Sequence, residues 1–182
     1  MLKHVLVIGG TGMLSDVCLW LVNQNYQVSV IGRNPEKMQR LVNSTTVSSQ
    51  LTPVLVDYTN YEALKQNLLQ IQEQNGPFDM VVAWIHGTDL SIWQTLFHSI
   101  PMSKNSILYH VNGSRTNLEK VKRKLNVPKN ISYHQIKLGF IVENAQSRWL
   151  THEEISNGII QAIEGNNHKK IIGVLEPWDK RP

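Results

Sequence analysis

The stretch Val5-Leu6-Val7-Ile8-Gly9-Gly10-Thr11-Gly12-Met13-Leu14-Ser15 decides the fold of this chain. Its apolar, β-branched start is typical of a buried strand, and a helical pattern follows the glycines. A glycine turn between strand and helix brings backbone N–H groups close to a pyrophosphate at the positive end of the helix dipole. Gly10 and Gly12 match the G-x-G-x-x-G template, and Ser15 stands at its third glycine. The loop predicts a phosphate site, and the alternative is a tight turn that binds nothing.

The rest of the chain alternates short apolar runs with segments of helical period, which is the pattern of stacked βαβ units. The expected strands are His4–Ile8, Gln27–Ile31, Val54–Val56, Met80–Ile85, Ile107–Val111, Ile131–Leu138 and Lys170–Val174. The expected helices are Met13–Asn23, Pro35–Val42, Thr59–Gln74, Leu90–Ser99, Thr116–Leu125 and Thr151–Gly165, with capping boxes formed by Thr59 with Glu62 and by Thr151 with Glu154. Seven strands and six crossover helices predict one α/β domain over residues 1–182, with a single doubly wound parallel sheet, helices on both faces and a surface tail from residue 176.

Length, charge and cysteine content exclude several classes of protein. The 182 residues suit one domain, and the net charge of +4 is too modest to indicate nucleic acid by itself. Cys18 is the only cysteine, so no intrachain disulfide can form, and no closely spaced Cys and His predict a metal site. The apolar runs are shorter than a membrane span, and the first ends in glycines and not in a cleavage site. We therefore expect a cytoplasmic protein with no membrane partner.

The type of dinucleotide is read at the end of the second strand, Ile31-Gly32-Arg33-Asn34. Sites specific for NAD usually place an acidic residue there for the ribose 2′-hydroxyl. No acid stands at this point, and the planar fork of Arg33 could pair with a 2′-phosphate. The sequence favours NADP(H) over NAD(H), and the alternative is an arginine that only faces solvent.

These features resemble the short-chain dehydrogenase/reductase family, especially its atypical members with a G-A-T-G-x-x-G loop. The loop from Gly9 follows that pattern except at Ser15, and Arg33 matches the basic position of NADP-preferring members. Asp57-Tyr58-Thr59 resembles the family's Asp-x-[Thr/Ser] segment. The resemblance implies a Rossmann fold, and it implies that Asp57 accepts a hydrogen bond from the adenine amino group.

Further segments of the family pattern would lie along the cofactor. Ala83-Trp84-Ile85-His86 stands where Asn-Asn-Ala-Gly is expected, so Trp84 and His86 would line the site, although a buried Trp84 without ligand contact is the alternative. Leu138-Gly139-Phe140-Ile141 resembles the family's Pro-Gly-x-x segment beside the nicotinamide. The expected cofactor-binding residues are Gly9, Gly10, Thr11, Gly12, Met13, Leu14, Arg33, Asp57, Tyr58, Trp84 and Gly139.

The family's chemistry rests on a tyrosine and a lysine four residues later on the helix after the fifth strand, where the lysine lowers the tyrosine pKa. The chain has two such spacings. Tyr61 and Lys65 fall on the helix after the third strand, and Tyr133 and Lys137 fall on the sixth strand, where this spacing holds the two groups too far apart. We therefore expect that neither pair is the family's dyad.

Other groups could serve in its place. His86 is a candidate acid/base because histidine exchanges protons near neutral pH. Ser114, in the serine-bearing segment Asn112-Gly113-Ser114, could orient a carbonyl, and Tyr109 is a further proton-donor candidate. Arg148 and Trp149 follow the sixth strand, where the family closes over substrate, and Arg148 could bind a carboxylate or phosphate bidentately.

Three functions remain open at this point. The first is a reductase that uses NADPH on a small carbonyl or imine substrate. The second is a regulatory protein that binds NADP(H) without turnover. Nucleic-acid binding is the third, through a basic run in which no aromatic residues interleave, so we expect a solvated helix face and no nucleic-acid partner. That run is Arg115, Lys120, Lys122, Arg123, Lys124 and Lys129. The resemblance also allows a homodimer.

Overall fold

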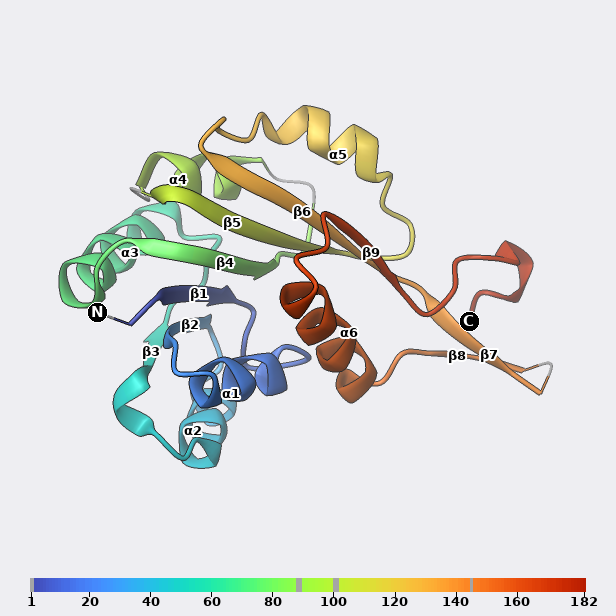
Figure 1. Ribbon diagram of the computed structural model, residues 1–182, viewed down its shortest axis with the longest axis horizontal. Coiled ribbons are helices and arrows are strands. Elements are labelled where there is room, and N and C mark those ends of the chain that lie inside the picture. Colours follow the sequence, from blue (N-terminus) through green and yellow to red (C-terminus); the bar gives the residue numbers. More distant parts are fainter. Residues whose placement is uncertain (1, 88–89, 100–101, 145) are drawn as a thin grey trace.

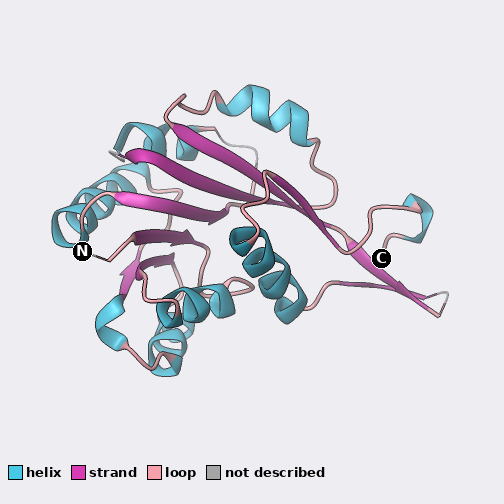
Figure 2. Ribbon diagram, viewed as in Figure 1, coloured by secondary structure: helices cyan, strands magenta, loops and turns pink. Residues whose placement is uncertain are grey.

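A seven-stranded parallel sheet forms the centre of the molecule (Figures 1 and 2). The computed structural model describes residues 2–87, 90–99, 102–144 and 146–182. Within these residues the strand order is β3-β2-β1-β4-β5-β6-β9, and every neighbouring pair is parallel. The strands are β1 (His4–Ile8), β2 (Gln27–Gly32), β3 (Leu51–Leu55), β4 (Phe78–Trp84), β5 (Met102–Asn112), β6 (Ile131–Leu138) and β9 (Lys169–Ile172). The predicted doubly wound sheet is confirmed.

Helices cover both faces of the sheet. One face carries α1 (Ser15–Asn23), α2 (Pro35–Ser44) and α6 (His152–Glu164), and the other carries α3 (Tyr61–Asn75), α4 (Ser91–Ser99) and α5 (Leu118–Leu125). Each layer closes one hydrophobic core against the strands, so the central strand β1 is buried at all five positions. None of these helices, as far as the structure describes them, is long and apolar enough to cross a membrane.

The crossover connections reverse direction between β1 and β4, which are adjacent in the sheet. In an open parallel sheet, such a reversal leaves a crevice at the carboxyl ends of the strands, where ligands bind. The glycine loop follows β1, and the segment from Trp84 to His86 follows β4. The topology therefore brings two of the predicted site segments to one place.

The predicted helix starts lie within two residues of the observed ones, and one of the two predicted capping boxes is confirmed. Thr151 and Glu154 form the predicted capping box of α6, in which each side chain bonds the other residue's backbone N–H. The box predicted for Thr59 and Glu62 is wrong, because Asn60 caps α3 by accepting from the Ala63 N–H at 3.1 Å. Thr59 instead donates its N–H and hydroxyl to Asp57.

The largest unpredicted element is an antiparallel hairpin between β6 and α6. It pairs β7 (Phe140–Glu143) with β8 (Gln146–Trp149) and extends away from the sheet (Figure 1). The third strand also differs, since it begins at Leu51 and includes Pro53, which an edge strand tolerates because its outer side needs no ladder hydrogen bond. Two short 3-10 turns, Ser48–Gln50 and Trp178–Lys180, complete the described elements.

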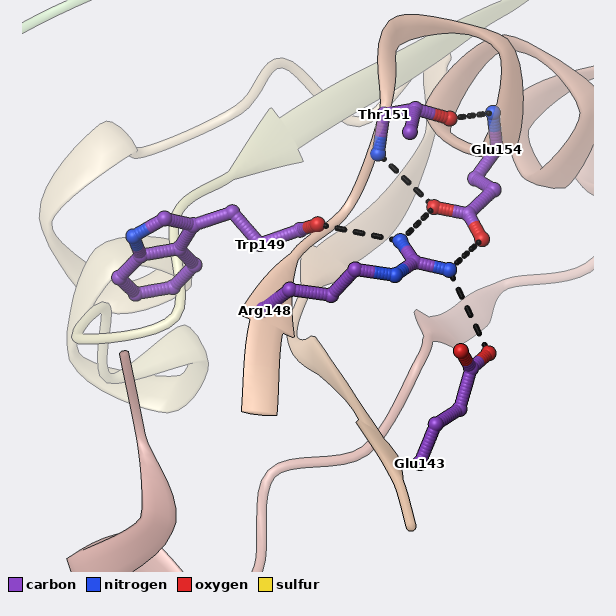
Figure 3. A network of polar contacts seen from close by, with 5 residues as sticks. All are labelled: Glu143, Arg148, Trp149, Thr151 and Glu154. Carbon is purple, nitrogen blue, oxygen red and sulfur yellow. Dashed lines mark hydrogen bonds and ion pairs between the residues drawn. The ribbon is translucent and has the colours of Figure 1, made fainter. Parts of the chain in front are cut away.

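Arg148 joins this hairpin to α6 (Figure 3). Its guanidinium forms a bidentate pair with Glu154, at 2.8 and 2.9 Å, and a longer contact of 3.4 Å with Glu143. The hydrogen bonds from Arg148, with those from Thr151, lower the pKa of the Glu154 carboxyl to about 2. The contact therefore fixes the start of α6, which is the helix that packs against α1.

Leu68→Ala should destabilise the domain by about 2–5 kcal/mol, because a fully buried leucine leaves a cavity when it is truncated. Urea unfolding followed by circular dichroism measures the change. Leu69→Ala is the matched control on the same helix, since Leu69 is 44% exposed, and it should change stability by less than about 0.5 kcal/mol. Equal losses in the two variants would contradict the register of α3.

Glu154→Gln should lower the melting temperature near neutral pH and have no effect in strong acid. The folded pKa of Glu154 lies below its ordinary value of 4.5, so the charge stabilises the fold above that value. This contribution is lost as the pH falls through 4.5 toward about 2. Thermal unfolding of wild type and variant across this range checks it, with Glu153→Gln as the neighbouring control. A difference between wild type and Glu154→Gln that persists at the lowest pH would contradict this assignment.

Candidate functional site

The glycine loop begins with a residue that only glycine suits. Gly9 has a φ of +80°, and its N–H donates to the Ile31 carbonyl of β2 at 3.1 Å. A Cβ at Gly9 would lie 2.8 Å from the carbonyl oxygen of Trp84 in β4. The loop therefore passes between the ends of β2 and β4, and a side chain there would force it out of the crevice.

The next two glycines differ in what surrounds them. A Cβ at Gly10 would lie 2.6 Å from Val30 Cγ1 and 2.8 Å from Cys18 Sγ, so Gly10 permits close packing of α1 on the sheet. A Cβ at Gly12 would meet nothing within 4 Å. Gly12 thus borders open space, into which a ligand phosphate could come close to the backbone.

The helix start beside this space is open to an anion. Leu14 is the N-cap of α1, and its side chain makes no capping hydrogen bond. The Ser15 N–H donates to the Gly12 carbonyl at 3.0 Å, which leaves the N–H groups of Asp16 and Val17 as the open donors of the first turn. Such N–H groups attract negative charge at the positive end of the helix dipole. Ser156 of α6 donates its hydroxyl to the Met13 carbonyl at 2.8 Å and so anchors the loop from behind. Asp16 is exposed, as expected for an acid beside a phosphate site.

A cleft of about 430 Å³ lies over this loop and is called here the cofactor cleft. Seven of the residues expected to bind a cofactor line it, which are Gly9, Thr11, Gly12, Met13, Arg33, Tyr58 and Trp84. Four do not line it. Gly10 and Leu14 pack into the core beneath the loop, and Asp57 forms an ion pair with Arg33. A Cβ at Gly139 would lie 2.1 Å from the Val174 carbonyl oxygen, so that glycine serves strand packing.

The segment after β2 borders one end of this cleft with basic side chains. Arg33 and Lys37 both line it, and no acid is among its described lining residues. Arg33 is mostly exposed and pairs with Asp57 across 3.7 Å. Hydrogen bonds from Thr59, more than the charge of Arg33, lower the pKa of Asp57. Both oxygens of Asp57 therefore face groups of the protein itself.

The segment at the end of β4 forms an aromatic wall of the cofactor cleft. The Trp84 indole N–H donates to His86 Nε2 at 2.8 Å, and the two rings meet edge to face. The His86 backbone N–H donates to the Tyr58 hydroxyl at 3.3 Å. Because Nε2 of His86 accepts a hydrogen bond, the neutral ring carries its proton on Nδ1.

Trp84 and His86 also border a second cleft, of about 590 Å³, between the ends of β4 and β5 and the helices α4 and α5. This second cleft contains His110, Trp93, Asn112 and three cations, Arg115, Lys120 and Lys124. Its described lining includes no aspartate or glutamate. The two clefts are therefore neighbours separated by one shared pair of side chains.

Two of the three candidate catalytic residues lie outside both clefts. Tyr109 is 1% exposed in the core under α1 and α6, and burial raises its pKa to about 12. Ser114 is buried, and its hydroxyl accepts a hydrogen bond from Arg181 Nε of the C-terminal tail at 3.1 Å. Only His86 lines the clefts.

The tyrosine–lysine spacings also lie away from the cofactor cleft. Tyr61 and Lys65 are on α3, and Tyr133 and Lys137 are on β6, where burial raises the pKa of Tyr133. The substrate candidates Arg148 and Trp149 are on β8 and line neither cleft. Arg148 is held by Glu154, and the Trp149 ring lies 4.7 Å from the Arg181 guanidinium.

Several lining residues were missed from the sequence. Lys37 follows Arg33 by one helical turn, and the helix start at Asn34 was the signal that could have found it. His152 enters the cofactor cleft from α6, and no local pattern marks it. His110 enters the second cleft from β5, where strand alternation lets at most one of Tyr109 and His110 matter, and Tyr109 was the residue favoured from the sequence. No group of metal-binding side chains occurs within the described ranges.

Comparison with known proteins agrees with this architecture. The family model described as short chain dehydrogenase matches residues 3–112. No curated protein matches the sequence.

Three solved structures share the fold. A short chain dehydrogenase/reductase family oxidoreductase of Aeromonas hydrophila superposes with a TM-score of 0.68 at 15% identity, covering 95% of this chain and 99% of that one. A double mutant of a Serratia marcescens short-chain dehydrogenase/reductase gives 0.67 at 15% identity, with coverage of 93% and 95%. A Brucella melitensis protein described as a short-chain dehydrogenase/reductase and glucose/ribitol dehydrogenase gives 0.68 at 10% identity, with coverage of 93% and 94%. At these identities the likeness concerns the fold alone. The matched family model, which spans the glycine loop and the first five strands, places this chain in the short-chain dehydrogenase/reductase family.

Proposed function

We propose that this protein is an NADPH-dependent reductase of a small carbonyl compound, with the dinucleotide in the cofactor cleft. The observation that carries the proposal is the open space at Gly12 beside an uncapped helix start, in a cleft that also contains Arg33 and Lys37. This arrangement fits a pyrophosphate at the loop. The two cations and the lack of a lining acid favour a 2′-phosphate over a free 2′-hydroxyl.

In this proposal the cofactor cleft holds the dinucleotide and the adjoining second cleft holds the carbonyl compound. A bound NADPH supplies the hydride that the carbonyl carbon receives, which leaves NADP⁺ and an alkoxide oxygen to be protonated. His86 borders both clefts and carries its proton on Nδ1, since Nε2 accepts from Trp84. We propose that His86 Nδ1–H donates a hydrogen bond to the developing alkoxide oxygen, which then takes its proton from water and leaves the His86 ring neutral.

Arg33→Ala should weaken NADPH and NADP binding by about 1–3 kcal/mol, because it removes a charge-assisted contact to the 2′-phosphate. Binding of NADH and NAD should change little. Calorimetric titration with all four dinucleotides measures both effects, and Arg123→Ala on α5 is the charge-matched control outside the cofactor cleft. Failure of all four to bind the wild type would refute the dinucleotide site, and equal weakening of NADH and NADPH would refute the role of Arg33.

His86→Gln should lower kcat by about 10²–10³-fold, the range expected when a hydrogen-bond donor to a developing oxyanion is lost, with NADPH affinity kept. Glutamine retains an acceptor for the Trp84 indole, so the wall of the clefts is preserved. The loss of NADPH absorbance with a carbonyl substrate measures the rate, and His98→Gln, on exposed α4 surface, is the control. An unchanged kcat would remove His86 from the reaction.

A second candidate function is NADP(H) binding without turnover. It is favoured by the contact of Arg181 with Ser114 and by the distance of both tyrosine–lysine pairs from the cofactor cleft. Tight NADPH binding without oxidation across a broad set of aldehydes and ketones would support this regulatory role over the reductase.

A further inference from the structure

The described lining of the second cleft has three positively charged side chains and no negatively charged one. Arg115, Lys120 and Lys124 line it, and none of them forms an ion pair within the described residues. Glu119, the only acid of α5, is in contact with Lys169 at 4.0 Å and does not line the cleft. Trp84 and Trp93 supply aromatic surface on other sides. Such a lining suits a ligand with both negative charge and a planar apolar part.

A buried histidine lies beside this charge. His110 is 6% exposed, and its ring lies 4.4 Å from that of Trp93. Its Nδ1 is 2.8 Å from the Tyr133 hydroxyl of β6, and its Nε2 has no partner in the part of the chain that the structure describes. Burial lowers the pKa of His110 to about 3, so the ring is neutral at neutral pH. Since Nε2 is not among the buried side-chain atoms that lack a partner, it is accessible from the cleft and is open to a ligand.

A chain of hydrogen bonds decides which nitrogen of His110 carries the proton. The Gln135 side-chain NH₂ donates to the Leu118 carbonyl at 2.9 Å, which fixes that group as the donor end of the amide. The same NH₂ donates to the Tyr133 oxygen at 3.2 Å. The Tyr133 hydroxyl proton then points to His110, so Nδ1 accepts and the proton of the neutral ring is on Nε2.

We propose that the second cleft binds a small organic acid that has a carbonyl group next to its carboxylate. The carboxylate lies among Arg115, Lys120 and Lys124, and the oxygen of the neighbouring carbonyl accepts a hydrogen bond from His110 Nε2. Because this cleft adjoins the cofactor cleft at Trp84 and His86, the carboxylate is the substrate. This last step, which makes the substrate a carbonyl compound with an acidic group, rests on the proposed reductase function.

A neutral donor is well suited to such a ligand. A protonated histidine would add a fourth positive charge in a buried place, whereas the Nε2–H of a neutral ring offers one directional hydrogen bond. The cations on the exposed side attract the carboxylate, and the donor on the buried side selects for an acceptor near it. The cations and the His110 donor together select for a ligand in which a carbonyl lies next to a carboxylate.

Benzoylformate is the probe, because it has a carboxylate, an adjacent carbonyl and an aromatic ring. Its methyl ester differs mainly in charge and is the paired control ligand. Calorimetry on the protein without added dinucleotide should show that benzoylformate binds at least about tenfold more tightly than the ester, which corresponds to about 1.4 kcal/mol. Lys120→Gln should weaken benzoylformate by about 5-fold or more, while Lys122→Gln, on the same helix but outside the cleft, should not change it.

Nitrogen NMR of the imidazole rings tests the role of His110 without a buried substitution. The resonances of His110, assigned by their loss in a His110→Gln variant, should report protonated Nε2, and benzoylformate should shift the Nε2 signal. If that variant does not fold, Tyr133→Phe provides the assignment through a selective change at Nδ1. Protonated Nδ1, or an Nε2 signal that benzoylformate leaves unmoved, would overturn the assignment.

The outcomes separate this inference from the proposed function. Benzoylformate binding without any NADPH binding would keep the anion site and refute the reductase. NADPH binding, together with no benzoylformate binding or equal binding of the ester, would overturn the anion site and leave the reductase proposal standing. Binding of both ligands, with oxidation of NADPH by benzoylformate, would support the whole inference.

Discussion

The close passage of one backbone turn between two strand ends is the constraint on which the rest of the structure depends. Gly9 is at once in a left-handed conformation, hydrogen-bonded to β2, and too near the Trp84 carbonyl for any side chain. This arrangement lets β1 lie between β2 and β4 with both faces buried, and it directs α1 across one face of the sheet. The same turn places N–H groups at the crevice. Folding and ligand binding therefore impose the same requirement on this glycine.

The second organising feature is the pair Trp84 and His86. The usual family segment at this position consists of small and amide side chains, and two rings replace it here. The indole N–H fixes the histidine ring, and Tyr58 holds its backbone from the other side. This wall keeps the two clefts distinct, and the His86 ring borders both. The proposed reaction therefore depends on a ring at a position where the family's pattern has only small and amide side chains.

The sequence specified the sheet, its helices and the glycine loop well, because each depends on patterns within a few residues. The box of Thr151 and Glu154 is such a case. The box predicted for Thr59 was wrong because the neighbouring Asn60 is an equally good N-cap residue and the Thr59 hydroxyl donates to Asp57. The hairpin after β6 was missed, since its strands have four residues each and little alternation. Long-range contacts were beyond reach. His110 meets Tyr133 only through the pairing register of β5 and β6, and Ser114 meets Arg181 across 67 positions.

The contact of Arg181 with Ser114 bears on how the protein is handled. The guanidinium is near the rings of both Trp149 and Trp178 while its Nε donates to the serine, so the last turn of the chain is a fitted part of the surface. Only Pro182 would separate Arg181 from an affinity tag joined after it, so such a tag would disturb the contact with Ser114. The other terminus lies at the opposite end of the molecule (Figure 1), so a tag or a surface linker belongs ahead of β1.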